Sequence, residues 1–147
     1  MAPHANETLI RRLYSFFNNR KYDEAQKLVS DEFEWRDAAT GETYRGRDGV
    51  RQFMERWVSG FDDARIEIER IVAGDHAVAT EFIGRGTHTG TIQTPAGELP
   101  PTNRKIELRC CEVGVIENGK IRSGSTYYDA ATLMAQLGVT DLAGAAH

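Results

Sequence analysis

The stretch Gly124–Gly138, GSTYYDAATLMAQLG, decides the fold, because it joins a predicted strand to the last predicted helix of the chain. The strand ends in two tyrosines. The helix is expected to run from about Asp129 to Leu137 and to stop at Gly138, since glycine commonly follows a helix C-terminus. The role of the aspartate between the two elements is therefore the first question that the sequence raises.

Asp129 is interpreted first as the N-cap of this helix. Its side chain can accept hydrogen bonds from the amides of Ala131 or Thr132. Such bonds keep a carboxylate ionised and lower its pKa, which makes it a poor base. A carboxylate at the end of a strand can also lie at the rim of a pocket, so Asp129 is kept as a candidate catalytic residue.

The segment before this stretch, residues 105–128, is predicted to form a β-hairpin. Asn118 and Gly119 supply the two positive-φ residues of a type I′ turn, which is the strongest local signal in the chain. Alternation along the first strand of this hairpin places Glu112 on an apolar face. The residues that share this face are Leu108, Cys110 and Ile116.

Glu112 is the leading candidate for a general acid or base. A carboxylate among apolar neighbours is costly to ionise, so its pKa is expected to rise toward neutrality. A group with such a pKa suits proton transfer. The alternative is an outward glutamate paired with Arg109 or Arg122, because a bulge of one residue would exchange the two faces.

The chain before residue 105 places helices first and strands afterwards. Asn6 is expected to cap the first helix. The predicted elements are helices over residues 6–20, 21–33 and 47–61, a hairpin over 33–46, strands over 64–74 and 75–92, and a loop over 93–104.

This order of elements predicts an α+β fold in a single domain, residues 1–147, with an ordered core of about residues 6–139. We expect a curved antiparallel sheet wrapped around the N-terminal helices. Glycines at 84, 86 and 90 suggest bends in the long strand. Such a sheet forms a cone, and an apolar cone closed at one end makes an internal ligand pocket.

Composition excludes several classes of partner. The net charge of −4 and pI of about 5.6 disfavour binding to nucleic acid, which requires basic surface. No run of about 18 apolar residues predicts a membrane span. The first residues lack the basic-then-apolar order of a signal peptide, so the cytoplasm is the expected location.

Metal and cofactor sites are not expected either. The two cysteines, Cys110 and Cys111, are adjacent and are interpreted as reduced thiols packed among apolar residues. The four histidines are scattered, so no set of zinc ligands forms at a recognisable spacing. No glycine-rich phosphate loop or nucleophile elbow is present in the sequence.

His88 is the second candidate for a catalytic role. It lies in GTHTG, on the predicted face of Val78, Phe82 and Ile92, and its imidazole could donate to a carbonyl or exchange a proton. A hydrogen-bonded structural histidine is an equally good interpretation.

Aromatic side chains are expected to line part of the cavity, where Tyr and Trp would offer polar tips to a flat, oxygenated ligand. One tyrosine of the pair 127–128 should point inward. The candidate ligand-binding residues are Tyr14, Trp35, Tyr44, Trp57, Phe82 and Tyr127.

Three motifs occur together in the second half of the chain: PPT-x-R at residues 100–104, N-G-K-I at 118–121, and D-x-x-x-L-x-x-Q-L-G at 129–138. With the order of elements, they resemble the SnoaL-like branch of the nuclear-transport-factor-like superfamily, which includes polyketide cyclases and ester cyclases. The matching residues extend from about Leu9 to Val139. The resemblance implies a cone-shaped pocket and a homodimer packed through the sheets.

The resemblance also marks catalytic positions. Polyketide cyclases of this branch carry a catalytic aspartate on the last strand and an assisting histidine on the strand before it. Those positions are Thr126 and Glu112 here. Threonine cannot act as a base near neutral pH, so the reactive group is sought at Glu112. Relatives similar to ketosteroid isomerases carry a base near Asp37, although the residues that follow Asp37 favour a simple turn aspartate.

Two functions are consistent with these features. The first is proton transfer next to a carbonyl, without a cofactor, in the isomerisation, dehydration or cyclisation of a hydrophobic, oxygenated small molecule. The second is a non-catalytic ligand-binding or dimeric scaffold protein of the same fold. An open cavity of roughly several hundred Å³ holding a carboxyl and an imidazole would favour the enzyme, and a filled cone would favour the scaffold.

Overall fold

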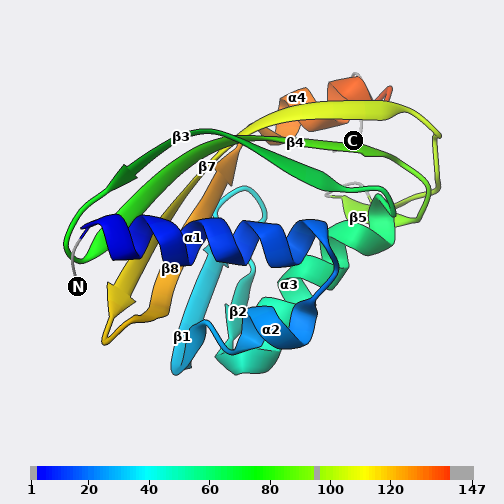
Figure 1. The fold of residues 1–147 in the computed structure, drawn as a ribbon. Coiled ribbons are helices and arrows are strands. Elements are labelled where there is room, and N and C mark those ends of the chain that lie inside the picture. Colours follow the sequence, from blue (N-terminus) through cyan, green and yellow to red (C-terminus); the bar gives the residue numbers. More distant parts are fainter. Residues whose placement is uncertain (1–2, 95–96, 140–147) are drawn as a thin grey trace.

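A curved sheet packed against helices forms the centre of the computed structural model, which describes residues 3–94 and 97–139 (Figure 1). The helices are α1 (Pro3–Asn18), α2 (Tyr22–Gln26), α3 (Gly46–Gly60) and α4 (Ala130–Gln136). The strands are β1 (Val29–Asp37), β2 (Thr43–Arg45), β3 (Arg65–Ala73), β4 (Ala77–Thr87), β5 (Ile92–Thr94), β6 (Gly97–Leu99), β7 (Lys105–Glu117) and β8 (Lys120–Tyr128).

Within the described ranges, the large sheet has six strands in the order β2-β1-β8-β7-β4-β3. The α+β class is as predicted, but the sheet is mixed because β1 and β8 are parallel. Alternation showed which residues form strands and which face is apolar, but it carries no information about which strands become neighbours. The parallel pair matters for the site, because it sets Trp35 beside Gly124 and Asp37 beside Thr126.

Helices α1 and α3 cover one face of this sheet, and α1 crosses in front of the strands (Figure 1). Both helices present an apolar stripe to the sheet, which is why they pack there. In α1 the buried stripe consists of Leu9, Ile10, Leu13, Tyr14 and Phe17. No helix in the described part of the chain is long and apolar enough to cross a membrane.

Asn6 is not the N-cap of α1, which begins at Pro3. Its side chain is fully buried, and its Nδ2 donates hydrogen bonds to the carbonyls of Gly74 and Asp75, at 2.9 and 3.0 Å. The tertiary contact outweighs the local capping preference of asparagine, because these carbonyls in the turn between β3 and β4 need donors.

The hairpin and the last helix agree with the sequence prediction. Asn118 and Gly119 both have positive φ, at 53° and 75°, as a type I′ turn requires. Asp129 caps α4: its Oδ1 accepts from the amides of Ala131 and Thr132, at 2.9 and 3.4 Å.

The predicted loop over 93–104 contains part of a small second sheet, in which β5 pairs with β6. This hairpin is held against the end of α3, because the amides of Thr89 and Gly90 both donate to the carbonyl of Gly60. A side chain at Gly90 would overlap the Ser59 carbonyl, so the close approach requires glycine there. Strand β5 of this hairpin thereby becomes one wall of a cleft that α3 and α4 also border.

Candidate active site

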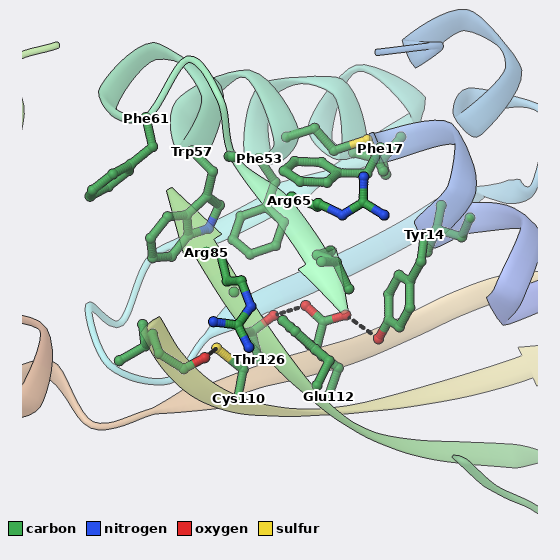
Figure 2. Close-up of a pocket in the computed structure, with 18 of the residues that line it drawn as sticks. Tyr14, Phe17, Phe53, Trp57, Phe61, Arg65, Arg85, Cys110, Glu112 and Thr126 are labelled. Carbon is green, nitrogen blue, oxygen red and sulfur yellow. Dashed lines mark hydrogen bonds between the residues drawn. The ribbon is translucent and has the colours of Figure 1, made fainter. Parts of the chain in front are cut away.

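An apolar cavity of about 100 Å³ lies between the sheet and helices α1 and α3 (Figure 2). Four of the six predicted ligand-binding residues line it: Tyr14, Trp35, Trp57 and Phe82. The polar side chains of Glu112 and Thr126 also face it, from the neighbouring strands β7 and β8. The sheet and the two helices therefore border a small, partly open cavity, and Glu112 is the carboxyl group among the described residues that line it.

Glu112 points inward, as alternation predicted, because β7 alternates between exposed and more buried residues along almost its whole length. The carboxyl group has no ion pair with any described Arg or Lys side chain. Arg109 bonds Glu69 instead, at 2.6 Å, and Arg122 lies 3.9 Å from Glu117. The alternative of an outward glutamate paired with arginine is therefore not what the structure shows.

Hydroxyl groups hold both oxygens of this carboxyl (Figure 2). Tyr14 donates from its phenol to Oε1 at 2.6 Å, and Thr126 donates from Oγ1 to Oε2 at 2.6 Å. The indole Nε1 of Trp35 donates to the same Thr126 oxygen at 2.7 Å. Because an indole N–H can only donate, it leaves the threonine proton free to point at Glu112.

Burial is the main influence on the pKa of Glu112 and raises it. The hydrogen bonds from Thr126 and Tyr14 favour the ionised form and oppose the shift, and the nearby charge of Asp37 adds to it. Burial, and then the charge of Glu112, raise the pKa of Tyr14, so Tyr14 stays a donor. The site thus combines a carboxyl that ionises with difficulty and two hydroxyl groups. Each hydroxyl can donate a hydrogen bond to the ionised carboxyl or accept one from the protonated carboxyl.

Replacing Tyr14 by phenylalanine should raise the pKa of Glu112 further, because one of the two hydrogen bonds that favour its ionised form is lost. The measurement is the pH dependence of the carboxyl C=O infrared band, assigned as the band that disappears in Glu112→Gln. Tyr22→Phe serves as the control, since Tyr22 is on α2 and does not line the cavity. A midpoint that is unchanged or lower in Tyr14→Phe would contradict the assigned hydrogen bond.

His88 does not line the cavity. The inward alternation of β4 continues at His88, whose backbone pairs with Asn103 and Arg104, but its ring packs behind Phe61, which lines the cavity in its place. The ring is fully buried, its Nδ1 accepts from the backbone amide of Thr102 at 3.1 Å, and it packs on Phe61 with ring centroids 5.4 Å apart. Burial lowers its pKa. These contacts favour the structural interpretation of this histidine.

Two of the predicted ligand-binding residues lie outside the cavity. Tyr44 is buried beside Phe53 and bonds Glu42 and Arg56 through its hydroxyl. Tyr127 is half-exposed on the outer face of the sheet. Since Thr126 points inward, its neighbour must point outward and Tyr128 inward again. These positions correct the prediction for Tyr44 and Tyr127.

Asp129 is exposed and committed to its helix. The hydroxyl of Thr132 donates to its Oδ2 at 2.9 Å, and this bond with those from the backbone amides lowers its pKa. It does not line the cavity. Among the described residues, no group of three His, Cys, Asp or Glu side chains could hold a metal ion.

Asp37 is a turn aspartate, as its neighbours indicated. Its Oδ1 accepts from the amides of Ala39 and Thr40, at 3.0 and 3.3 Å, and its Oδ2 accepts from the hydroxyl of Tyr128 at 3.3 Å. Burial raises its pKa, against these bonds. Sequence reasoning missed the contact with Tyr128 and the hydrogen bond between Tyr14 and Glu112, because neither leaves a local pattern.

Solved structures with the same fold cover nearly the whole chain. IdmH of Streptomyces antibioticus, a candidate polyketide cyclase, is 27% identical with a TM-score of 0.75, over 90% of this chain and 98% of its own. A candidate SnoaL-like polyketide cyclase of Jannaschia sp. CCS1 is 13% identical with a TM-score of 0.81, over 92% of each chain. AclR of Streptomyces galilaeus, a candidate hydroxylase, is 18% identical with a TM-score of 0.78, over 93% of this chain and 83% of its own.

A comparison with curated proteins gave no match. The model of the SnoaL-like polyketide cyclase family matches residues 7–137, which include every residue that lines the cavity. The chain therefore belongs to the SnoaL-like polyketide cyclase family.

Proposed function

We propose that this protein binds a hydrophobic, oxygenated small molecule and transfers a proton at a carbon next to a carbonyl group, without a cofactor. The observation that carries the proposal is a buried carboxyl on a largely apolar wall, held by hydroxyl groups and with no ion pair to any Arg or Lys in the described part of the chain. Family membership and the 27% identity to a candidate cyclase support the same class of reaction.

In this proposal, ionised Glu112 removes a proton from the carbon next to the carbonyl, and an enolate forms. In an isomerisation the same proton returns to another carbon of the ligand. In a cyclisation the enolate carbon attacks a second carbonyl of the same molecule, and protonated Glu112 gives its proton to the resulting alkoxide. Such acid–base work typically contributes about 10²–10⁴-fold to a rate.

The position of the carboxyl supports this role. Glu112 and Thr126 are direct partners across β7 and β8, and they occupy the two positions that the family resemblance marks as catalytic. The acidic group is on β7 in this chain, and the residue opposite it supplies a hydroxyl donor. Glu112 and Thr126 therefore lie where the resemblance expects a histidine and an aspartate, but the carboxyl is on the other strand of the pair.

Deuterium exchange tests the proposal without knowledge of the natural substrate. Cyclohexanone and 2-tetralone are incubated in D₂O with the wild-type protein and with Glu112→Gln, and label at the α-carbon is followed by mass spectrometry. We expect catalysed exchange with the wild type and its loss in the variant. Equal exchange by both proteins would remove Glu112 from the mechanism.

A non-catalytic ligand-binding or dimeric scaffold protein is the second candidate, and the small cavity favours it over the enzyme. The volume of about 100 Å³ is smaller than the roughly 150 Å³ of an engineered protein cavity that binds benzene. The imidazole expected beside the carboxyl is also not on the cavity wall. If the protein binds the ketones but deuterium exchange at their α-carbon is no faster than in buffer alone, the non-catalytic function is supported.

We also propose that the outer face of the sheet forms a homodimer. Four residues lie side by side across β3, β4, β7 and β8 on this face: Val72, Ala79, Val113 and Ser125. The side chain of Val72 is 61% exposed and that of Val113 is 37% exposed. The apolar band therefore crosses β3, β4 and β7 and ends at Ser125 on β8, and such a band is typical of a surface that packs against another molecule.

The variant Val113→Lys should be monomeric, because a second copy would have to bury an unpaired charge at the centre of the band. Sedimentation equilibrium of the wild type and the variant measures this directly. Gln52→Lys is the control, since Gln52 is exposed on α3, away from the sheet. A wild-type monomer, or a dimer that survives Val113→Lys, would contradict this interface.

A further inference from the structure

A second hollow lies next to the inner cavity. This outer cleft has a volume of about 520 Å³ and is bounded by the turn after β1, the end of α3, the strand β5 and the helix α4. Two aromatic residues, Trp57 and Phe61, line both the inner cavity and the outer cleft. They therefore form the partition between the two spaces.

The two halves of the partition are held differently. Phe61 is 2% exposed, packs on the ring of His88, and lies so close to Gly86 that a β-carbon there would come within 2.9 Å of it. Trp57 is partly exposed, and its indole N–H makes no hydrogen bond with any described residue. Its ring meets Tyr128 edge-on, with centroids 5.4 Å apart. Trp57 is thus the less constrained side of the partition.

The outer cleft has both polar and apolar walls. Tyr128 lines it, and its hydroxyl is held by the buried carboxylate of Asp37. Arg56 lines it as well and bonds Glu42 and Tyr44. The apolar side consists of Ile92, Leu133 and Met134. A flat ligand with oxygen substituents would match this combination.

We infer that the ligand spans both spaces: one ring, with its carbonyl or hydroxyl oxygen, lies beside Glu112, and a second oxygenated ring occupies the outer cleft. Trp57 lies at the junction of the two spaces, beside the bond that joins the two rings, and determines how long a ligand the protein accepts. This inference rests on the proposed function for the identity of the inner group. Its physical basis is volume, because the inner cavity cannot hold more than about one ring, whereas the adjoining cleft is about five times larger.

The methionines allow a direct test, because Met54 lines only the inner cavity and Met134 lines only the outer cleft. The protein is labelled with ¹³C in the methyl groups of its three methionines, and the signals of Met54 and Met134 are assigned with Met54→Leu and Met134→Leu. Phenol is the one-ring probe and 4-phenylphenol is the two-ring probe. We expect nuclear Overhauser contacts from phenol to Met54 alone, and from 4-phenylphenol to both methyl groups.

A variant that fills the cleft provides the second measurement. Ser59 is exposed and lines the cleft, so Ser59→Trp should weaken binding of 4-phenylphenol about tenfold and leave phenol unchanged. Gln52→Trp is the matched control on the same helix, outside both spaces. Contacts of 4-phenylphenol to one methyl group or to neither, or equal weakening of both probes by Ser59→Trp, would overturn the inference. These readouts do not depend on proton transfer, so a protein that fails the exchange test can still pass this one.

Discussion

Replacing Glu112 by glutamine is expected to lower ketone α-proton exchange by about 100-fold or more while making the folded protein more stable above neutral pH. The activity falls because an amide neither removes nor returns a proton at this pH. The stability rises because the variant places no ionisable carboxyl in the apolar cavity. Exchange rates and urea unfolding, measured on the same samples between pH 5 and about 9, check both parts.

The direction of the stability effect follows from the raised pKa of Glu112. Between the ordinary glutamate pKa and the raised one, the folded protein binds more protons than the unfolded chain. The stabilising contribution is therefore fully present below the ordinary pKa and is lost as the pH rises through the raised value. Each unit by which the pKa is raised corresponds to about 1.4 kcal/mol of this loss.

The difference between wild type and variant isolates Glu112 from other groups. Burial also raises the pKa of Asp37, so it adds a similar slope in both proteins and largely cancels in the comparison. Glu117→Gln is the control, since Glu117 is exposed at the end of the same strand. A wild-type stability that rises with pH relative to Glu112→Gln would mean that the carboxyl is stabilised in its ionised form, which would contradict the role proposed here.

Alternation was sufficient to predict the inward direction of Glu112, because β7 continues without a bulge through that position. Local chemistry was likewise sufficient for the type I′ turn and for the cap of α4, since each depends on residues within a few positions of one another. For the strand direction, the turn and the cap alike, nearby residues determine which local conformation has the lower free energy. The sequence alone therefore shows which conformation is favoured.

The partners of Glu112 could not be predicted in the same way. Tyr14 is 98 residues away and reaches the carboxyl only because α1 packs across the sheet. The hydrogen bond from Trp35 to Thr126 depends on the parallel pairing of β1 with β8. For His88 the period-two pattern predicted the buried face, but not that Phe61 would line the cavity in front of the imidazole ring.

Gly124 also determines how the Trp35 side chain is held. Trp35, Gly124 and Gly114 lie side by side across β1, β8 and β7, and the indole ring packs over both glycines. A β-carbon at Gly124 would overlap the Trp35 ring and the carbonyl of Val113. A β-carbon at Gly114 would meet its nearest atoms, those of the same ring, at 3.8 Å, an ordinary contact distance.

Gly124→Ala should therefore destabilise the protein by about 1–3 kcal/mol or more, because neither the ring nor the backbone carbonyl can move freely. Gly114→Ala is the matched control, and it should be neutral or more stable by about 0.4–1 kcal/mol, since alanine restricts the unfolded chain. Urea unfolding measures both effects.

Gly124→Ala and Gly114→Ala should also differ in their effect on Glu112. Displacing the indole in Gly124→Ala should break its hydrogen bond to Thr126, and with it the arrangement that directs the threonine proton at Glu112. Because that proton favours the ionised carboxyl, its loss should raise the pKa of Glu112 further in Gly124→Ala and leave it unchanged in Gly114→Ala. Infrared titration of the carboxyl band distinguishes the two variants, and an unchanged midpoint in Gly124→Ala would show that Trp35 does not hold Thr126 in place.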